Sequence, residues 1–318
     1  MPVTRIILDT DLSMGAGADV DDGFALALAH ADPDIQMDLI TTVNGNTDVE
    51  SATILTGVLL NRLGIQDTPL VRGSVTPIIH TDQRRTPAPH VLALKDTARP
   101  STPGYAPVAI VEHILANPGE ITIVAIGPLT NVAIALLLEP QIKTAIKELV
   151  VMGGVFFGTM YSRDKPGEFN VFSDPEAARA VLRSGIPQRW IGLDCTLQVR
   201  LTKADAQELK KASSSFAAFA GDATMAYIDY QASRFPGRPK TESIPMHDPL
   251  AVAVVSKPDL CEYRDMAVSI ITGDGEARGI MIAVRLETPS PPIPNCRVAV
   301  DVDSKAFRSR FLTFIQRL

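Results

Sequence analysis

Short apolar runs alternate with longer amphipathic segments through the first two thirds of the chain, and this alternation most constrains the fold. The paired runs and segments are 5–8 with 21–31, 37–43 with 48–64, 121–126 with 129–138, 148–153 with 174–185, and 189–193 with 203–212. Strands interleaved with helices whose apolar residues recur about every 3.6 positions are typical of β-α-β units in a parallel sheet. The sequence therefore predicts an α/β fold built on a doubly wound, mostly parallel, Rossmann-like sheet.

The C-terminal part of the chain follows a different pattern. Short apolar runs at 267–271, 279–284 and 296–300 precede a closing amphipathic segment that starts near Ser304. We expect a few extra short strands there, followed by a helix. A doubly wound sheet can carry 318 residues as one unit, so residues 1–318 are expected to form a single domain. The Pro- and Thr-rich segment 73–105 is expected to be a long excursion or lid.

Charge and composition exclude several classes of protein. The net charge of −6 and the pI near 5.4 argue against a nucleic-acid surface, which would need clustered Lys and Arg. We find no apolar run of the ~18 residues that a membrane span needs, and no leader pattern at the N-terminus. The three cysteines, at 195, 261 and 296, are far apart and lack metal-binding spacing. They indicate reduced thiols in a cytoplasmic protein.

An acidic cluster follows the first predicted strand. Residues 8–29 hold five carboxylates, at Asp9, Asp11, Asp19, Asp21 and Asp22. Two unit charges about 4 Å apart repel by roughly 4 kcal/mol near a protein surface, so a cation is expected among them. Carboxylate oxygens suit Ca²⁺ or Mg²⁺. Capping of the helix that begins near Asp21, or a solvated acidic loop, would explain some of these residues without a metal.

Polar stretches follow three other predicted strands. They are "VNGN" after the second strand, "GPLTN" after 121–126, and the run from "MGG" to "EFN" after 148–153. Ligands of doubly wound sheets bind beyond the carboxyl ends of the strands. Each stretch alone is consistent with a turn, but together they predict one crevice at that edge of the sheet.

The acidic segment "ILDTDLSMGAGADVDDGFALALA" resembles the N-terminal signature of the inosine–uridine nucleoside hydrolase family. The resemblance implies that Asp11 and Asp22 bind Ca²⁺ and that Asp21 is the base that activates water. The spacing between Asp11 and Asp21 is longer here than in the common family pattern. Asp19 is therefore interpreted as a helix cap or an outer group of the metal site.

Two further motifs resemble the same family. "TTVNGN" resembles its second-strand motif, which implies that Asn46 contacts a ribose hydroxyl. "AIGPLTN" resembles its Gly-x-Leu-Thr-Asn segment, which implies that the main-chain carbonyl of Thr130 completes the metal shell. An Asn-Gly-Asn turn and a helix start are the structural alternatives for these two stretches.

The longest resemblance runs from "VVMGG" through "EFN" to "SDPEAA". It implies that Met152 lines the ribose pocket and that Glu168 and Asn170 hydrogen-bond sugar hydroxyls. A methionine at a strand end is otherwise a core residue, and a Glu and Asn in a Gly/Pro-flanked loop are otherwise surface residues.

"PMHDPLAVAVV" resembles the family's His-Asp-Pro at a helix start. It implies that Asp248 is another Ca²⁺ ligand and that His247 is a proton donor near the leaving base. An N-cap followed by Pro is the structural alternative for Asp248. Tyr227 and Tyr230 are weaker candidates for the proton donor, because both fit an amphipathic helix.

Together these motifs, which run nearly end to end, imply a Ca²⁺-dependent ribonucleoside hydrolase of purine or pyrimidine salvage. The resemblance also implies a dimer or tetramer, a nucleoside substrate and the doubly wound nucleoside hydrolase fold. In the expected mechanism, an Asp-activated water cleaves the N-glycosidic bond and releases ribose and the free base.

Two departures from the family concern substrate recognition. Residues 90–101 lack a His-Gly-x-x-Gly-Leu motif, and residues 156–167 lack an Asn for the ribose 5′-hydroxyl. Ser162 or Arg163 could replace that Asn. The departures leave open a Ca²⁺- and ribose-binding protein without turnover. A haloacid-dehalogenase-like phosphatase, with Asp9 as nucleophile and Asp11 as acid/base around Mg²⁺, is a further alternative, but it gives "DVDDG", "EFN" and "HDP" no role.

Overall fold

The structure is a computed structural model that describes residues 3–14, 19–83, 85–158, 161–162, 165–234, 242–284, 290 and 292–318. The strands of its main sheet are β1 (Thr4–Thr10), β2 (Ile35–Thr42), β3 (Leu70–Arg72), β4 (Ile121–Ala125), β5 (Glu148–Met152), β8 (Gln188–Ile191), β11 (Cys261–Ile270), β12 (Met281–Val284) and β13 (Cys296–Val302). Their order across the sheet is β12-β11-β13-β8-β5-β4-β1-β2-β3. Two small pairs lie outside it: β6 (Tyr161–Ser162) with β7 (Lys165–Pro166), and β9 (Arg200–Thr202) with β10 (Ser243–Pro245).

The main sheet is parallel from β3 through β2, β1, β4, β5 and β8 to β13. Only β11 and β12, at one edge, run antiparallel to their neighbours. This confirms the predicted mostly parallel α/β sheet with extra strands near the C-terminus. The extra strands do not form a separate unit, because β13 pairs with β8 and continues the sheet.

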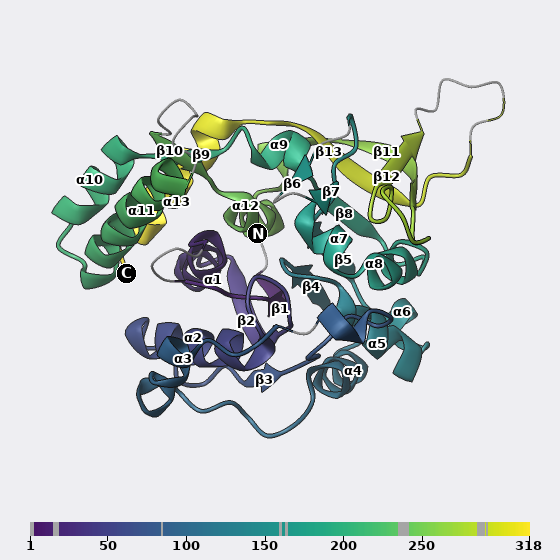
Figure 1. Cartoon of the computed structure of the whole chain (residues 1–318), viewed down its shortest axis with the longest axis horizontal. Helices are drawn as coiled ribbons and strands as arrows, with labels where there is room; N and C mark the ends of the chain where they lie inside the picture. The colour runs from purple at the N-terminus through teal and green to yellow at the C-terminus, as the bar shows by residue number, and fades with distance from the viewer. Residues whose placement is uncertain are drawn as a thin grey trace.

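Helices cover both faces of the sheet (Figure 1). Their bounds are α1 (Asp21–Ala31), α2 (Val49–Arg62), α3 (Pro89–Leu92), α4 (Ala106–Ala116), α5 (Thr130–Leu138), α6 (Ile142–Ala145), α7 (Phe169–Ser173), α8 (Pro175–Leu182), α9 (Leu193–Thr196), α10 (Lys203–Lys211), α11 (Ser215–Arg234), α12 (His247–Ser256) and α13 (Ser304–Ile315). Side chains alternate along each strand, so Ile6 and Leu8 pack toward α1, α12 and α13, while Ile7 packs toward α4, α5 and α8.

The helix α1 begins and ends where the sequence predicts. Its residues from Asp21 to Ala29 are buried, because α1 packs against the sheet and against its neighbours α12 and α13 on the same face. Two carboxylates stand in its first turn, where the positive end of the helix dipole favours negative charge. The helix α2 also follows its prediction, and the Asp48 side chain caps it by accepting from the Ser51 N–H.

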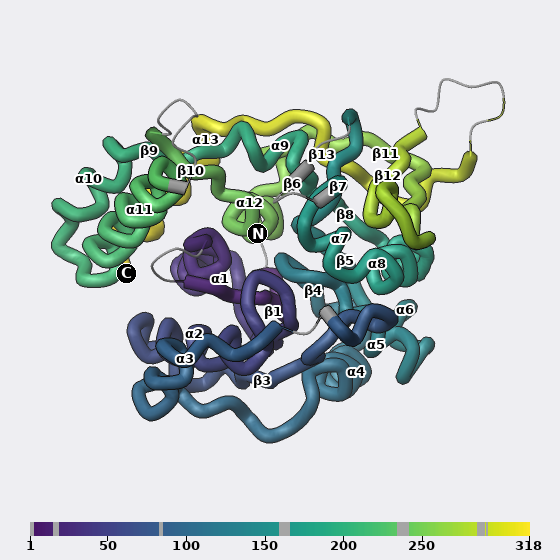
Figure 2. Tube along the Cα trace, viewed as in Figure 1, coloured from purple at the N-terminus to yellow at the C-terminus, as the bar shows by residue number. Residues whose placement is uncertain are grey.

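The predicted excursion at 73–105 runs along the β3 side of the sheet, past α2 and α3 to α4 (Figure 2). Its second half is joined to α2 and β3, since the N–H of Arg99 donates to the Gly57 carbonyl and that of Thr102 donates to the Leu70 carbonyl. The described part of the chain contains no helix that is both long and apolar enough to cross a membrane.

Candidate active site

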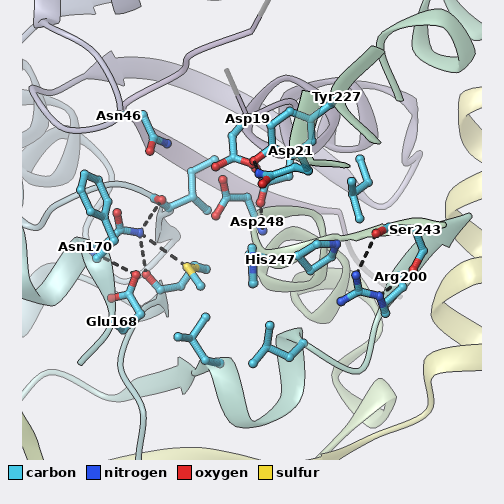
Figure 3. Close-up of a pocket in the computed structure, with 18 of the residues that line it drawn as sticks. Asp19, Asp21, Asn46, Glu168, Asn170, Arg200, Tyr227, Ser243, His247 and Asp248 are labelled. Atoms are coloured by element: carbon cyan, nitrogen blue, oxygen red, sulfur yellow. Dashed lines mark hydrogen bonds between the residues drawn. The ribbon is translucent and has the colours of Figure 1, made fainter. Parts of the chain in front are cut away.

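A pocket of about 340 Å³ opens at the carboxyl ends of the parallel strands (Figure 3). The predicted residues that line it are Asp21, Asn46, Met152, Glu168, Asn170, His247 and Asp248. They come from the loop after β2, the end of β5, the segment around α7, and the first turns of α1 and α12. The structure therefore brings together residues that lie up to 227 positions apart in the sequence.

Three carboxylates form the centre of the site. Single oxygens of Asp21, Asp22 and Asp248 all lie within 4.8 Å of one another, and all three residues are buried. Burial raises the pKa of Asp22 and of Asp248 well above the usual aspartate range, and the neighbouring carboxylates raise both further. The helix dipoles of α1 and α12 offset part of this repulsion, because each helix directs its N-terminus at the cluster.

Asp11 lies directly after β1 and is fully buried beside this cluster. Two glycines make room for its carboxylate. A Cβ atom at Gly45 would lie 2.1 Å from Asp11 Oδ2, and one at Gly127 would lie 3.0 Å from Asp11 Oδ1. A Cβ at either position would force the Asp11 carboxylate or its neighbours to shift, so the two glycines leave room for this side chain.

Asn46 links Asp11 to Asp22. Its backbone N–H donates to Asp11 Oδ2 at 2.6 Å, and its side-chain Nδ2 lies 3.0 Å from Asp22 Oδ2 and 3.4 Å from Asp11 Oδ1. The Thr10 hydroxyl donates to the other oxygen of Asp22 at 2.6 Å. These bonds fix the orientation of two of the predicted metal ligands.

The donor set fits a hard divalent cation. The cluster offers carboxylate oxygens, which Ca²⁺ and Mg²⁺ prefer, and the described residues around it include no cysteine. The raised pKa values of Asp22 and Asp248 express the free energy needed to hold several negative charges in a buried place. A divalent cation would remove that unfavourable term.

Glu168 and Asn170 lie on the opposite side of the pocket from α11 (Figure 3). The Glu168 carboxylate accepts from the backbone N–H groups of Asn170, Val171 and Gly154 at 2.8–3.1 Å. Burial raises the pKa of Glu168, and these three N–H groups partly oppose the rise. Asn170 Nδ2 donates to the carbonyl of Ile126 at 2.9 Å and lies 3.3 Å from that of Met152. Many of the hydrogen bonds of Glu168 and Asn170 therefore go to the backbone of the pocket wall.

His247 and Tyr227 line the other half of the pocket. His247 Nδ1 lies 2.7 Å from the Thr196 hydroxyl, which fixes the orientation of the imidazole. Tyr227 is buried, its hydroxyl hydrogen-bonds Asp19, and burial and Asp19 raise its pKa. Asp19 thus faces the pocket. Tyr230 stacks on Tyr227 and is not among the described residues that line the pocket.

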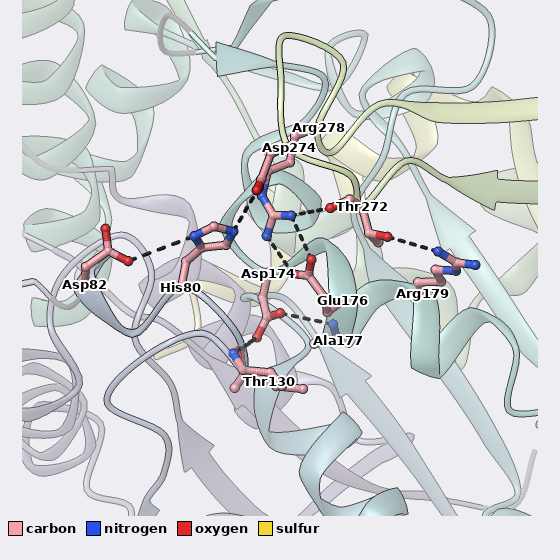
Figure 4. Close-up of polar contacts among 11 residues, drawn as sticks. His80, Asp82, Thr130, Asp174, Glu176, Ala177, Arg179, Thr272, Asp274 and Arg278 are labelled. Carbon is pink, nitrogen blue, oxygen red and sulfur yellow. Dashed lines mark hydrogen bonds and ion pairs between the residues drawn. The ribbon is translucent and has the colours of Figure 1, made fainter.

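Asp22 and Asp248 are the predicted ligands in the three-carboxylate cluster, and Asp11 lies beside it, joined to Asp22 through Asn46. Thr130 makes its contacts elsewhere. It begins α5, so its carbonyl points along that helix, and its hydroxyl donates to Asp174 Oδ2 at 2.7 Å (Figure 4). Asp174 caps α8 and also accepts from the Ile78 N–H, so it joins three segments of the fold. The residue that contributes its backbone to the pocket is instead Ile126, directly after β4.

Asp9, one of the five acids of residues 8–29, forms its hydrogen bonds with Thr41 and Asn131 rather than with the carboxylate cluster. Its carboxylate is fully buried and accepts from the Thr41 hydroxyl at 2.5 Å and from Asn131 Nδ2 at 2.8 Å. Burial raises the pKa of Asp9 to about 7. Asp9 is not among the described pocket-lining residues, so it is not placed to act as the nucleophile of a phosphatase.

Sequence reasoning also pointed to Ser162 and Arg163 as replacements for a missing Asn. Arg163 lies outside the described residues, and the Ser162 side chain is not described either. Arg200 of β9 is one of several pocket residues on the side of His247 that sequence reasoning missed. Nothing in its local sequence, "QVRLT", signals a site.

Known proteins resemble this chain over its whole length. The sequence profile of the family described as inosine-uridine preferring nucleoside hydrolase matches residues 6–309. The inosine-uridine preferring nucleoside hydrolase of Leishmania major is 31% identical over 327 aligned residues, which cover 99% of this chain and 98% of that protein. A plant nucleoside hydrolase superposes with a TM-score of 0.88 at 27% identity and full coverage of both chains. A purine-preferring ribonucleoside hydrolase from Gardnerella vaginalis superposes with a TM-score of 0.83 at 26% identity, covering 99% and 98% of the two chains.

Proposed function

The chain belongs to the inosine-uridine preferring nucleoside hydrolase family and is a hydrolase of N-glycosyl bonds, and from this premise we propose how its residues act. We propose that it uses Ca²⁺ and an Asp-activated water to convert ribonucleosides into ribose and free base. The observation that carries the proposal is the meeting of Asp21, Asp22 and Asp248 at the carboxyl edge of the sheet, beside a pocket. Membership in this family gives no support to the two alternatives, a haloacid-dehalogenase-like phosphatase and a Ca²⁺- and ribose-binding protein without turnover.

The metal would be held by Asp11, Asp22 and Asp248. Asp11 is enclosed by Gly45 and Gly127, and Asp22 is oriented by Thr10, so both carboxylates are fixed in advance. When bound, the ion supplies positive charge and Lewis acidity for oxygen ligands, including the vicinal hydroxyls of a ribose.

We propose that a backbone carbonyl completes the metal shell and that it belongs to Ile126 rather than Thr130. Ile126 lines the pocket, and its neighbour Gly127 lies against the Asp11 carboxylate. Its carbonyl already accepts from Asn170 Nδ2, so the oxygen faces the sugar side of the pocket.

Asp21 would take the proton of the attacking water. Its Oδ2 lies 3.4 Å from the Asp248 N–H, at the centre of the cluster, and its residue lines the pocket. As water attacks the ribose C1′, one proton passes to Asp21 and the electron pair of the C1′–N bond passes to the base. The surrounding carboxylates favour the positive charge that develops on the sugar.

His247, protonated before the reaction, would donate a proton to the departing base. Its ring lines the pocket between Asp248 and Arg200 in Figure 3, and Thr196 fixes its orientation. Asn46, Asn170 and Glu168 would hold the ribose hydroxyls on the other side, against Met152. Tyr227, hydrogen-bonded to Asp19, is better suited to shaping the pocket than to donating a proton, because burial and Asp19 raise its pKa and so make its hydroxyl a weaker acid.

We also propose a cellular compartment, an oligomeric state and a metabolic role for the protein. The three cysteines are free and buried, in keeping with a reducing, cytoplasmic compartment. Leu115 of α4 and Leu137 and Leu138 of α5 are about half or more exposed, which supports the expected dimer or tetramer. A role in purine or pyrimidine salvage follows from the products, a free base and ribose.

The direct test is release of base, followed by chromatography, from inosine, uridine, adenosine and cytidine. We expect release from at least one nucleoside, its loss after treatment with a chelator, and its recovery when Ca²⁺ is added. Activity that persists without any divalent ion would overturn the metal-dependent mechanism. No release from any nucleoside would overturn the proposed function.

A further inference from the structure

The end of the pocket beyond His247 carries a cation that the mechanism above does not use. Arg200 of β9 lines the pocket, and Figure 3 shows it on the far side of His247 from Asn46, Asn170 and Glu168. Among the described residues that line the pocket, Arg200 is the only lysine or arginine. The pocket thus has acids and amides at the sugar end and a guanidinium at the other.

The Arg200 side chain is held in a fixed orientation. Its Nε donates to the Ser243 hydroxyl at 2.8 Å, and its Nη2 donates to the Ser243 carbonyl at 2.8 Å. Ser243 lies on β10, which pairs with β9, so two short strands present the guanidinium together. Within the described residues Ser243 is its only hydrogen-bonding partner, and the N–H groups of Nη1 remain available to a ligand.

No acid in the described residues balances the charge of Arg200. Arg189 and Arg278 each pair with a carboxylate, at 2.7 Å and 2.6 Å, whereas no carboxylate in the described part of the chain forms an ion pair with Arg200. Arg200 is half-buried, and burial lowers its pKa. A half-buried guanidinium with spare donors is a binding site for an acceptor atom or for developing negative charge.

We propose that Arg200 donates hydrogen bonds to an exocyclic carbonyl oxygen of the base, and so selects nucleosides of oxo bases over those of amino bases. This inference rests on the proposed function, which puts the base on the His247 side of the pocket. Arginine has only hydrogen-bond donors, so it pairs with the carbonyl oxygen of uracil or hypoxanthine that lies farthest from the sugar. Cytosine and adenine carry an amino group at that position, which is also a donor and cannot pair with Arg200.

The same contact assists bond cleavage. When the C1′–N bond breaks, its electron pair passes to the ring nitrogen, and the negative charge spreads onto the exocyclic oxygen of an oxo base. Arg200 keeps all of its protons throughout, and the proton that neutralises the base comes from His247. The interaction strengthens as charge develops, so it contributes to kcat as well as to binding.

The test compares kcat/KM for inosine with adenosine, and for uridine with cytidine, in the native chain and in Arg200→Met. We expect the native chain to favour the oxo nucleoside of each pair, and the variant to lower both ratios by about tenfold or more. Arg200→Lys keeps the charge but loses the fork on Ser243, and should give intermediate ratios. Arg264→Met removes an exposed arginine of β11 outside the pocket and serves as the matched control.

Inhibition by free D-ribose separates base recognition from a merely structural role. Ribose lacks the base, so its inhibition constant should stay within about twofold in Arg200→Met; a larger change would show that the substitution disturbs the sugar site and would overturn the assignment. Unchanged ratios in an active native chain would overturn this inference alone. If the native chain releases no base from any of the four nucleosides, the proposed function is wrong and this inference falls with it.

Discussion

The backbone N–H of Asp248 lies 3.4 Å from Asp21 Oδ2, although 227 positions separate the two residues in the sequence. The contact joins the first turns of α1 and α12, which pack against each other along the same face of the sheet. It places the candidate base and a candidate metal ligand at two helix N-termini that converge on one pocket.

Asp21→Ala should leave the fold intact and lower kcat by about two to four orders of magnitude, because the general base is lost. The Asp21 carboxylate lies in the same cluster as Asp22 and Asp248, so its position alone does not separate a general base from a metal ligand. The Ca²⁺ affinity of the variant, measured by calorimetry, distinguishes these two roles. Retained Ca²⁺ binding with lost turnover supports the base. Retained turnover would remove Asp21 from the role.

His247→Gln should slow the release of natural bases more than the release of 4-nitrophenolate from its riboside. A good leaving group needs little protonation, so the variant should lose about 10²-fold or more on inosine or uridine and much less on the nitrophenyl riboside. Thr196→Val, which removes the hydroxyl beside His247 Nδ1, should give a weaker effect in the same direction. Equal losses on both substrate types would show that His247 is not the proton donor.

Gly45→Ala should weaken Ca²⁺ binding and destabilise the fold by about 1–3 kcal/mol, because the new Cβ would lie 2.1 Å from Asp11 Oδ2 and 2.8 Å from Pro128 Cδ. Gly273→Ala is the matched control, since its Cβ would have no neighbour within 4 Å. Denaturant unfolding and calorimetry measure the two effects. A Gly45→Ala protein with native Ca²⁺ affinity would show that the close approach to Asp11 does not matter.

The ion pair between Glu176 and Arg278 gives a pH-dependent prediction away from the pocket. Burial alone would raise the pKa of Glu176, but the bidentate contact with Arg278 at 2.6–2.7 Å outweighs it and lowers that pKa. Because the pKa of Glu176 is lower in the folded than in the unfolded chain, the pair stabilises the fold fully at pH values above the unfolded-state pKa of about 4.3. This stabilisation is lost as the pH falls through the lower, folded-state pKa.

Arg278→Met should therefore cost about 1.5–3 kcal/mol of unfolding free energy at pH 7, and the gap from the native chain should narrow below about pH 4. Denaturant titrations at several pH values measure this gap. Part of it will persist, because Arg278 also donates to the Thr272 carbonyl. A gap that is the same at pH 7 and pH 3 would contradict the assigned pair.

The alternation of strands and helices along the chain and the bounds of α1 follow from local signals in the sequence. The alternation of apolar runs with amphipathic segments fixes β-α-β units, and the acids at 21 and 22 mark the start of α1. The site residues were identified largely by resemblance, because a strand end does not reveal which way its polar side chains point. Asp9 and Thr130 illustrate this, since their partners Asn131 and Asp174 lie 122 and 44 positions away.

The sequence does not identify Ile126 or Arg200 as a contributor to the pocket. Ile126 offers its backbone, which any residue type would supply. Arg200 gains its orientation from Ser243, 43 positions later, on a strand of three residues. Such residues become visible only when the packing of distant segments is known.

The most direct test of the account is a crystal structure of the protein grown with calcium and D-ribose. We predict one ion in contact with the carboxylates of Asp11, Asp22 and Asp248, and with the ribose diol lying on its pocket side, next to Asn46 and Asn170. A structure in which no ion lies among these carboxylates, or in which ribose binds away from them, would contradict the account.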